Sequence, residues 1–227
     1  MLTFGGIGGG VMGGAVLSGV AKREKGQVIG FDPCQAATDA LHERCGLRAC
    51  DDEIEVTQQA DVILIAVKPQ HVQGVVEKIA PHLDGKILVS LAAGVSLRRI
   101  KTYSGDTCPT VVIMPNTPAM VGEGCCALCL DDPALNEEQK KLVLELFSAI
   151  STTVVLHESH IPEFSAFIGS GPAFIFHLLE SFVAVGLRPG FSYHDAKQLA
   201  EKLMVGRVPR APANPEVHHA KPPMHCA

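Results

Sequence analysis

Seven glycines lie between Gly5 and Gly14, in the run FGGIGGGVMGG. Within this run, Gly8, Gly10 and Gly13 have the G-x-G-x-x-G spacing of a dinucleotide-binding turn. In such a turn the first glycine allows a tight change from strand to helix, and the second lets the backbone approach a pyrophosphate. The third lets the helix lie close to the strand, while the helix N-terminus presents N–H groups to the phosphates. The spacing therefore predicts a phosphate-binding loop.

An acidic residue at a suitable distance strengthens this interpretation. The strand-like run QVIGF at 27–31 is followed by Asp32, nineteen residues after Gly13. A carboxylate at this position accepts hydrogen bonds from the adenosine ribose of a dinucleotide. A tight glycine turn without a ligand is the alternative.

Alternating strands and helices must position these groups. Continuous apolar runs of strand length indicate parallel strands that are covered on both faces. These runs lie at 61–67, 86–94 and 110–115. Helical stretches separate them, and this alternation predicts the α/β class. We expect a Rossmann-type, mostly parallel sheet in a dinucleotide-binding domain over residues 1–157.

The pattern becomes helical after His157. The next thirty residues predict a long apolar helix interrupted near GSGP at 169–172, and Ser192 begins a second helix with a weak capping box. Residues 158–206 are therefore expected to form part of an all-helical second domain, to which the family resemblance described below gives the role of a substrate and dimerisation domain. From 207 to 227, the prolines and the scarcity of apolar residues predict a disordered tail.

Composition and charge argue against several classes of protein. The chain has 227 residues, of which 47% are hydrophobic and 19% charged, as is typical of a globular protein with a core. A net charge of −5, no tryptophan and no basic run with interleaved aromatics argue against nucleic-acid binding. Residues 1–21 are uncharged, but their eight glycines and the cations that follow argue against a membrane span or a signal peptide.

The eight cysteines have no disulfide spacing, so we expect reduced thiols and a cytoplasmic protein. Cys126 and Cys129 form a C-x-x-C, but they lie in a strand-like run, whereas a redox pair belongs at a helix start. A structural zinc would need a second pair. The histidines near Cys226 lie in the predicted tail, without a fold to fix their geometry. No metal site is expected.

Five motifs occur in order along the chain: IGGGVM at 7–12, AVKPQ at 66–70, SLAAGVSL at 90–97, MPNTPAMVGEGCCALCL at 114–130 and GSGPAFIF at 169–176. Together they resemble the pyrroline-5-carboxylate reductase family, whose members make proline by reducing a cyclic imine. The resemblance covers roughly residues 3–206. It implies a nicotinamide-dependent reductase with an N-terminal Rossmann-type domain and a C-terminal helical dimerisation domain, and hence a homo-oligomer.

The resemblance also implies a set of site residues. The pyrophosphate loop would comprise Ile7, Gly8, Gly9, Gly10, Val11, Met12 and Gly13, and the adenosine end would face Phe31, Asp32 and Pro33. Further cofactor contacts would come from Ala66, Val67, Lys68, Pro69, Leu91, Ala92 and Ala93. The substrate, 1-pyrroline-5-carboxylate, would be bordered by Asn116, Glu158, Ser170 and Gly171. No catalytic residue is assigned.

Several of these assignments have simpler alternatives. Lys68 could be a solvated loop lysine, Asn116 could cap a turn, and Glu158 could favour the dipole of the helix that follows it. The cofactor is NADPH or NADH. Asp32 would repel a 2′-phosphate and so favours NADH, whereas the family often accepts NADPH, and both stay open.

The sequence departs from the family pattern at Val11, near Glu53 and near Val112, where a polar residue, an asparagine and an arginine are common. A larger departure follows Gly206. The family continues through further helices to a Ser-Pro-Gly-Gly-Thr-Thr segment that holds the substrate carboxylate, and nothing after Gly206 resembles it. This is interpreted as a frame change or an early end of the coding sequence.

That departure gives two hypotheses for the function. The chain is either a pyrroline-5-carboxylate reductase that reduces little or no imine, or a catalytically silent dinucleotide-binding protein. A dehydrogenase of small hydroxy acids would be expected to place a catalytic lysine on the first long helix of its second domain. Residues 161–187 contain no lysine, which argues against this third class.

Overall fold

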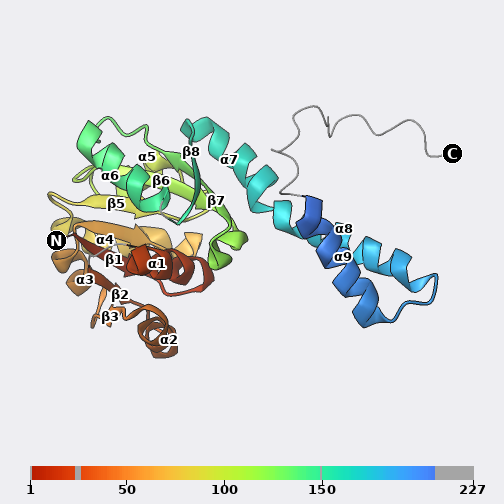
Figure 1. Cartoon of the computed structure of the whole chain (residues 1–227). Coiled ribbons are helices and arrows are strands. Elements are labelled where there is room, and N and C mark those ends of the chain that lie inside the picture. The colour runs from red at the N-terminus through yellow and green to blue at the C-terminus, as the bar shows by residue number, and fades with distance from the viewer. Residues whose placement is uncertain (1, 24–26, 149, 208–227) are drawn as a thin grey trace. The chain divides into compact units, whose positions relative to one another are not determined.

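The structure is a computed structural model, and it describes residues 2–23, 27–148 and 150–207. The chain divides into two compact units, one up to Ser170 and one from Gly171 onward. The predicted boundary at residue 157 stays a prediction, while the tail at 208–227, with its histidines and Cys226, lies outside the described residues. Figure 1 shows the elements in chain order.

The first unit alternates strands with helices. Its strands are β1 (Thr3–Ile7), β2 (Gln27–Phe31), β3 (Arg48–Ala49), β4 (Val62–Ile65), β5 (Ile87–Ser90), β6 (Thr110–Pro115), β7 (Gly124–Cys129) and β8 (Ser151–Val155). Its α-helices are α1 (Val11–Arg23), α2 (Gln35–Cys45), α3 (Glu53–Gln59), α4 (Val72–Ile79), α5 (Leu97–Tyr103), α6 (Glu137–Ser148) and α7 (Ile161–Phe164). Single 3-10 turns precede α4 and α7, as η1 (Pro69–His71) and η4 (Glu158–His160), and η3 (Thr117–Val121) joins β6 to β7.

The eight strands of the described residues form one sheet in the order β3-β2-β1-β4-β5-β6-β7-β8. Every neighbouring pair is parallel except β6 and β7. Only the short η3 turn joins those two strands, and a parallel pair would need a longer crossover. The predicted Rossmann-type, mostly parallel sheet is confirmed. Its strand order reverses at β1 and β4, the place where such sheets bind ligands.

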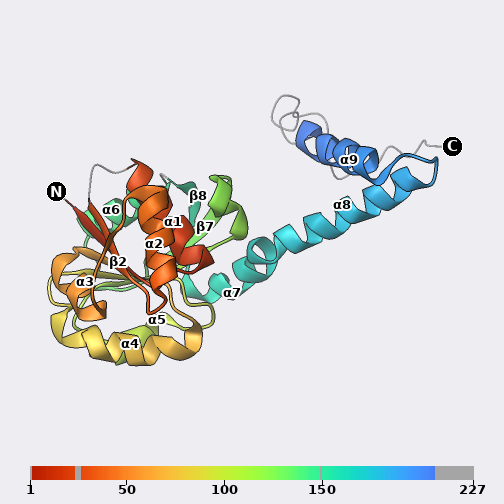
Figure 2. The same ribbon diagram turned by 90° about the horizontal axis from the view of Figure 1, so that it is seen from below.

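Helices cover both faces of the sheet, and β4 shows how the sequence encodes this. Val62 and Leu64 pack into one apolar core with residues of α1, α2 and α6. Ile63 and Ile65 pack into a second core with residues of α3, α4 and α5. Figure 2 shows α1 and α4 on opposite sides of the sheet. Because both faces are buried, the strand is a continuous apolar run and does not alternate with polar residues.

A buried ion pair joins α5 to the loop after β7. Asp132 is 2% exposed, and its carboxylate accepts hydrogen bonds from the Thr110 N–H at 2.8 Å and from Lys101 Nζ at 3.0 Å. Burial lowers the pKa of Lys101, but its hydrogen bonds to Asp106 and Asp132 outweigh burial and raise the pKa overall. The pair therefore fixes the start of β6 against α5.

The second unit is a helical hairpin of α8 (Gly171–Leu187) and α9 (Tyr193–Arg207). Ser192 caps α9, since the Asp195 N–H donates to its Oγ at 3.1 Å and this hydroxyl donates back to the Asp195 carboxylate at 2.7 Å. The two helices approach closely where Gly186 faces Ala196, because a Cβ on Gly186 would lie 2.9 Å from the Ala196 Cβ. A π-helical turn (Ser165–Gly169) precedes α8, where the sequence predicts an interruption.

Candidate functional site

The first βα turn has the geometry that its three glycines predict. Gly8 has a φ of +103°, and a Cβ there would lie 2.7 Å from the Ala66 carbonyl oxygen. A Cβ on Gly13 would lie 2.4 Å from the Gly8 carbonyl oxygen, so α1 lies against the turn too closely for any other residue. The Gly8 N–H donates to the Phe31 carbonyl at 2.9 Å. These contacts fix the start of α1 above the end of β1.

Gly10 differs from the other two glycines because it faces open space. A Cβ at Gly10 would meet nothing within 4 Å, and the neighbouring Val11 is 66% exposed. The first N–H groups of a helix have no partner within the helix, and they carry its partial positive charge. The open space therefore lies beside groups that bind anions, and this geometry fits the pyrophosphate of a dinucleotide.

Asp32 connects the glycine turn to the end of β2. Its Oδ2 accepts a hydrogen bond from the Gly9 N–H at 2.7 Å, and its Oδ1 accepts one from the Cys34 N–H at 2.8 Å. The sequence predicted only that Asp32 contacts the ribose. Its hydrogen bond to the Gly9 N–H, which restrains the glycine turn, was not predicted. Each carboxylate oxygen has a second lone pair, so both can still accept a hydrogen bond from a ribose hydroxyl.

A pocket of about 440 Å³ lies next to this turn. Five predicted cofactor residues line it: Ile7, Gly8, Phe31, Pro33 and Val67. Six other residues line it: Glu53, Gln70, His71, Gly74, Val75 and Lys78. From the sequence, Glu53 was named as a departure from the family pattern, and the other five were missed. Gln70 ends the AVKPQ motif and His71, Gly74, Val75 and Lys78 follow it, so the position of that motif after β4 is a signal that could have found these five.

An ion pair joins two residues that line this pocket. Lys78 Nζ lies 2.6 Å from a Glu53 carboxylate oxygen, and the hydrogen bond from this carboxylate raises the pKa of Lys78. Glu53 stands where the sequence departs from the family. With its charge paired, the pocket keeps apolar walls from Phe31, Val67 and Val75, which suits a flat ring such as adenine.

A larger pocket, of about 730 Å³, lies at the ends of β5 and β6. It brings together two predicted cofactor residues, Ala92 and Ala93, with the predicted substrate residue Glu158. Apolar side chains from Val112, Met114 and Ile161 complete much of its wall, while His157 and Ser159 add polar groups. An apolar pocket with few polar groups is the usual form of a small-molecule site.

Glu158 holds two elements together at the edge of this pocket. Its side chain accepts a hydrogen bond from the Leu97 N–H, at the start of α5, and its own N–H donates to the Asp131 carboxylate at 2.7 Å. The alternative from sequence placed Glu158 at the start of its own helix. Glu158 does begin η4, and its carboxylate in addition accepts the N–H at the start of α5, sixty-one residues earlier in the chain.

The other predicted substrate residues do not line this pocket. The Asn116 Oδ1 accepts from the Cys125 N–H at 2.8 Å, and its Nδ2 donates to the Ile168 carbonyl at 3.4 Å, so the amide joins β7 to the π-helical turn. Ser170 and Gly171 lie at the end of that turn, outside the lining. Lys68 is exposed and also lies outside both linings.

The two cysteines of the C-x-x-C, Cys126 and Cys129, are buried structural residues. Burial raises the pKa of both Cys126 and Cys129 to about 12, so the thiols stay protonated at neutral pH. Cys126 packs into one core and Cys129 into the other, on opposite faces of β7. Across the described ranges, no group of three or more His, Cys, Asp or Glu side chains has the geometry of a metal site.

The sheet order, the braced glycine turn and the pockets at the strand ends define a Rossmann-type dinucleotide-binding protein. Two family models match the chain: residues 3–94 match one described as NADP oxidoreductase coenzyme F420-dependent, and residues 158–221 match pyrroline-5-carboxylate reductase dimerisation. The second match continues past residue 206, where the sequence resemblance ends. Pyrroline-5-carboxylate reductases are similar along most of the chain, and the chain belongs to the pyrroline-5-carboxylate reductase family.

Two of these relatives show the extent of the similarity. The protein of Aquifex aeolicus is 32% identical over 82% of this chain and 68% of its own length. The protein of Corynebacterium melassecola is 30% identical over 88% of this chain and 76% of its own length. The similarity therefore includes both units.

Solved structures agree with this assignment. The pyrroline carboxylate reductase of Plasmodium falciparum, solved with NADP bound, has a TM-score of 0.84 and 26% identity, and the match covers 94% of this chain and 79% of that one. The enzyme of Coxiella burnetii has a TM-score of 0.83 and 27% identity, with 93% and 80% covered.

One helical run in the described residues, Glu158–Leu187, is long and apolar enough to cross a membrane by length and composition alone. The same run begins the match to the dimerisation model. Its exposed apolar side chains are therefore equally compatible with a surface that packs on another helix.

Proposed function

We propose that this chain is an NAD(P)H-dependent reductase that converts 1-pyrroline-5-carboxylate to L-proline. The observation that carries the proposal is the proximity, at one edge of one sheet, of a glycine turn open at Gly10 and a larger apolar pocket beside Glu158. The printed names of the relatives support the reaction, and the NADP in the Plasmodium falciparum structure supports the cofactor.

In this proposal each part of the site has one task. The loop from Ile7 to Gly13 holds the pyrophosphate, and the pocket at Phe31 and Val67 receives the adenosine end. A bound nicotinamide supplies the hydride for the C=N bond. The apolar wall at Val112 and Ile161 excludes water, which strengthens every electrostatic contact inside.

The remaining predicted residues keep more limited roles. Glu158 positions α5 at the edge of the larger pocket through the Leu97 N–H. Asn116, Ser170 and Gly171 stay predictions as substrate residues, since the amide of Asn116 already has two backbone partners. No side chain is assigned as a proton donor, so the chemistry depends on positioning, which can supply up to about 7–11 kcal/mol.

Steady-state turnover of the purified chain tests the proposal. Oxidation of NADPH or NADH, followed by nicotinamide absorbance, should depend on added pyrroline-5-carboxylate and yield proline. The matched variant is Gly10→Val, which adds a side chain where the structure has space, so its melting temperature should not change while cofactor binding weakens. Tight cofactor binding with no turnover would instead support the silent dinucleotide-binding protein.

The cofactor preference is tested by comparing the ratio of the NADH and NADPH dissociation constants between the wild type and variants of Asp32. Replacing Asp32 also removes the brace on Gly9, so affinity for both cofactors should fall. The variants Asp32→Ser and Asp32→Asn should each shift the ratio of dissociation constants toward NADPH, because the negative charge that repels a 2′-phosphate is gone. A ratio that stays constant in both variants would mean that Asp32 does not contact the ribose.

We also propose that the enzyme is a cytoplasmic homo-oligomer. Every cysteine among the described residues is a free thiol, as expected in a reducing compartment. The match to a dimerisation model covers α8 and α9, and these helices expose large apolar side chains. Sedimentation of the purified chain at several concentrations tests whether it self-associates.

A further inference from the structure

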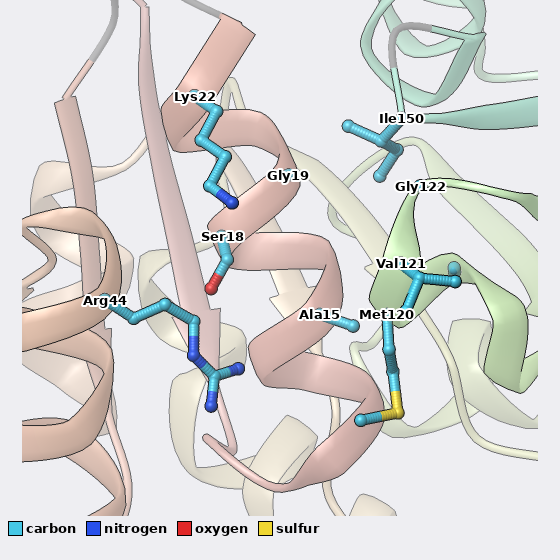
Figure 3. Close-up of a pocket in the computed structure, with 10 residues that line it drawn as sticks. Ala15, Ser18, Gly19, Lys22, Arg44, Met120, Val121, Gly122 and Ile150 are labelled. Atoms are coloured by element: carbon cyan, nitrogen blue, oxygen red, sulfur yellow. The ribbon is translucent and has the colours of Figure 1, made fainter.

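A third pocket, also of about 440 Å³, lies over the middle and the C-terminal end of α1, between α2 and η3. It shares no lining residue with the two pockets of the proposed active site. Figure 3 shows its walls: Ser18 and Lys22 on α1, Arg44 on α2, and Met120, Val121 and Ile150 on the opposite side. The proposed reductase activity uses none of these six residues.

The polar wall contains a hydroxyl without a partner. Ser18 is 6% exposed, and its Oγ is buried and has no hydrogen-bond partner within the part of the chain that the structure describes. A buried hydroxyl without a partner costs free energy, because folding removes its bonds to water and replaces them with nothing. Such a group in a pocket wall is expected to have a partner that the protein alone does not supply.

Two cationic side chains line the same pocket as that hydroxyl. In the view of Figure 3, the Ser18 oxygen lies between the amine of Lys22 and the guanidinium of Arg44. The Arg44 guanidinium extends over α1, since its Nη1 lies 3.9 Å from where a Cβ on Gly14 would be. Among the described residues that line the pocket, none is an aspartate or a glutamate. The polar wall is therefore a cluster of hydrogen-bond donors with net positive charge.

The opposite wall is apolar and exposed. Met120 is 57% exposed and Val121 is 77% exposed, and both lie on η3 beside Ile150. Covering large apolar side chains with a ligand is favourable, because it removes apolar surface from water. The pocket thus offers donors for an anion on one side and an apolar surface on the other.

We propose that this pocket binds a small phosphate monoester with a short apolar body. A phosphate monoester carries close to two negative charges near neutral pH and three strong acceptor oxygens. These match the two cations and the hydroxyl of Arg44, Lys22 and Ser18, whereas a carboxylate offers one charge and two oxygens. The apolar body then covers Met120 and Val121. This inference is independent of the proposed reductase reaction.

Backbone amide shifts in a nuclear magnetic resonance titration test the proposal. The full chain, in a buffer free of phosphate, is titrated with phenyl phosphate, with inorganic phosphate and with benzoate. Phenyl phosphate should shift amides of residues 15–22, 44 and 119–122. Because a phosphate could also enter the glycine turn, the amides of residues 8–12 report that event separately. Shifts confined to residues 8–12 would overturn the proposal.

Matched variants connect the shifts to the side chains. Arg44→Gln should weaken phenyl phosphate binding by about tenfold or more, because a charge-assisted contact is lost. Lys141→Gln, an exposed cation on α6, should leave binding unchanged. Met120→Ala should weaken phenyl phosphate binding but not that of inorganic phosphate. Equal affinity in Arg44→Gln and the wild type would overturn the proposal.

Ser18→Ala separates a binding role from a structural one. Removing a hydroxyl without a partner should leave the melting temperature unchanged or raise it, while phenyl phosphate binding weakens. A fall in melting temperature with unchanged binding would overturn the proposal. Benzoate that binds as tightly as phenyl phosphate would overturn the assignment to phosphates. Self-association that depends on Arg44, without any small-molecule binding, would show that the occupant is a second chain.

Discussion

The two units of this chain are both rich in apolar residues, but only the first buries most of them. In the first unit, both faces of the sheet are covered, and the side chains from Val62 to Ile65 are fully buried. In the described part of the second unit, the buried cluster consists of Val183, Ala196 and Ala200. Phe174 and Phe176 are 68% and 64% exposed. A similar apolar content therefore gives a complete core in one unit and an open surface in the other.

The difference follows from the geometry of the elements. A sheet with helices on both faces can bury every side chain of a central strand. A hairpin of two helices buries only the stripe where they meet, and a helix that is apolar all round needs further neighbours. An apolar patch of this kind on a folded unit indicates an interaction surface.

The largest effect is expected from breaking the buried ion pair of the first unit. Lys101→Met leaves the Asp132 carboxylate buried without its cation, which should cost about 3–5 kcal/mol of unfolding free energy. Lys141→Met is the control, because its partner Glu145 is 3.8 Å away and both are exposed, so about 0–1 kcal/mol is expected. Urea unfolding measures both. Equal losses would mean that the buried pair does not stabilise the first unit.

A pair of truncations compares the two units directly. Leu64→Ala, at a fully buried position of β4, should cost about 2–5 kcal/mol at any protein concentration. Phe176→Ala, at an exposed position of α8, should change stability by less than about 0.5 kcal/mol in dilute solution. Its effect should appear as weaker self-association in sedimentation. A large loss from Phe176→Ala in dilute monomer would show that the hairpin has a core of its own.

Alkaline pH should destabilise the first unit selectively. Burial raises the pKa of Cys108 to about 11 and that of Cys126 to about 12, from an ordinary value of 9.0. The unfolded thiols ionise first, so stability is fully present below pH 9 and falls as pH rises from 9 toward those folded values. Each thiol should cost about 1 kcal/mol for each pH unit in this range. Residues 171–207 contain no cysteine.

Denaturant melts of the wild type and of Cys126→Val at pH 8 and pH 10 check this expectation. The variant should lose less stability between the two values, because one ionising thiol has been removed. An equal loss in both proteins would mean that the Cys126 thiol does not ionise on unfolding.

Smaller effects than those of the buried ion pair and the buried leucine are expected at helix caps, one in each unit. Asp52 caps α3 by accepting from the Glu55 N–H at 2.8 Å, and Ser192 caps α9 in the second unit. Alanine at either position should cost about 1 kcal/mol. Asp52→Ala should lower the melting temperature of the whole first unit, whereas Ser192→Ala should change hydrogen exchange only in α9. Global destabilisation by Ser192→Ala would show that the two units unfold together.

The features that follow from local pattern were predictable from the sequence. The strand over 61–67 is readable because burial on both faces leaves no polar position, and the glycine spacing fixes the turn at Gly8. The antiparallel β7 was not specified, since a strand pattern does not contain its direction. The short η3 connection was the only indication.

Contacts between distant residues could not be predicted. The Glu158 side chain meets the Leu97 N–H, and the Asn116 side chain meets the Ile168 carbonyl, across sixty-one and fifty-two positions. No local rule relates such pairs, because the fold alone brings them together. The motif that contains Asn116 indicated the part of the chain near the site. Only the structure shows that the Asn116 amide bonds to two backbone groups and does not line the pocket.

The brace between Asp32 and Gly9 has a consequence for engineering. A designer who wants to exchange one nicotinamide cofactor for the other would first change the acidic residue after β2. In this chain the same carboxylate also restrains the glycine loop. A single replacement would therefore change the cofactor specificity and also lower the affinity for both cofactors. A useful redesign would therefore introduce a new acceptor for the Gly9 amide together with a cation for the extra phosphate.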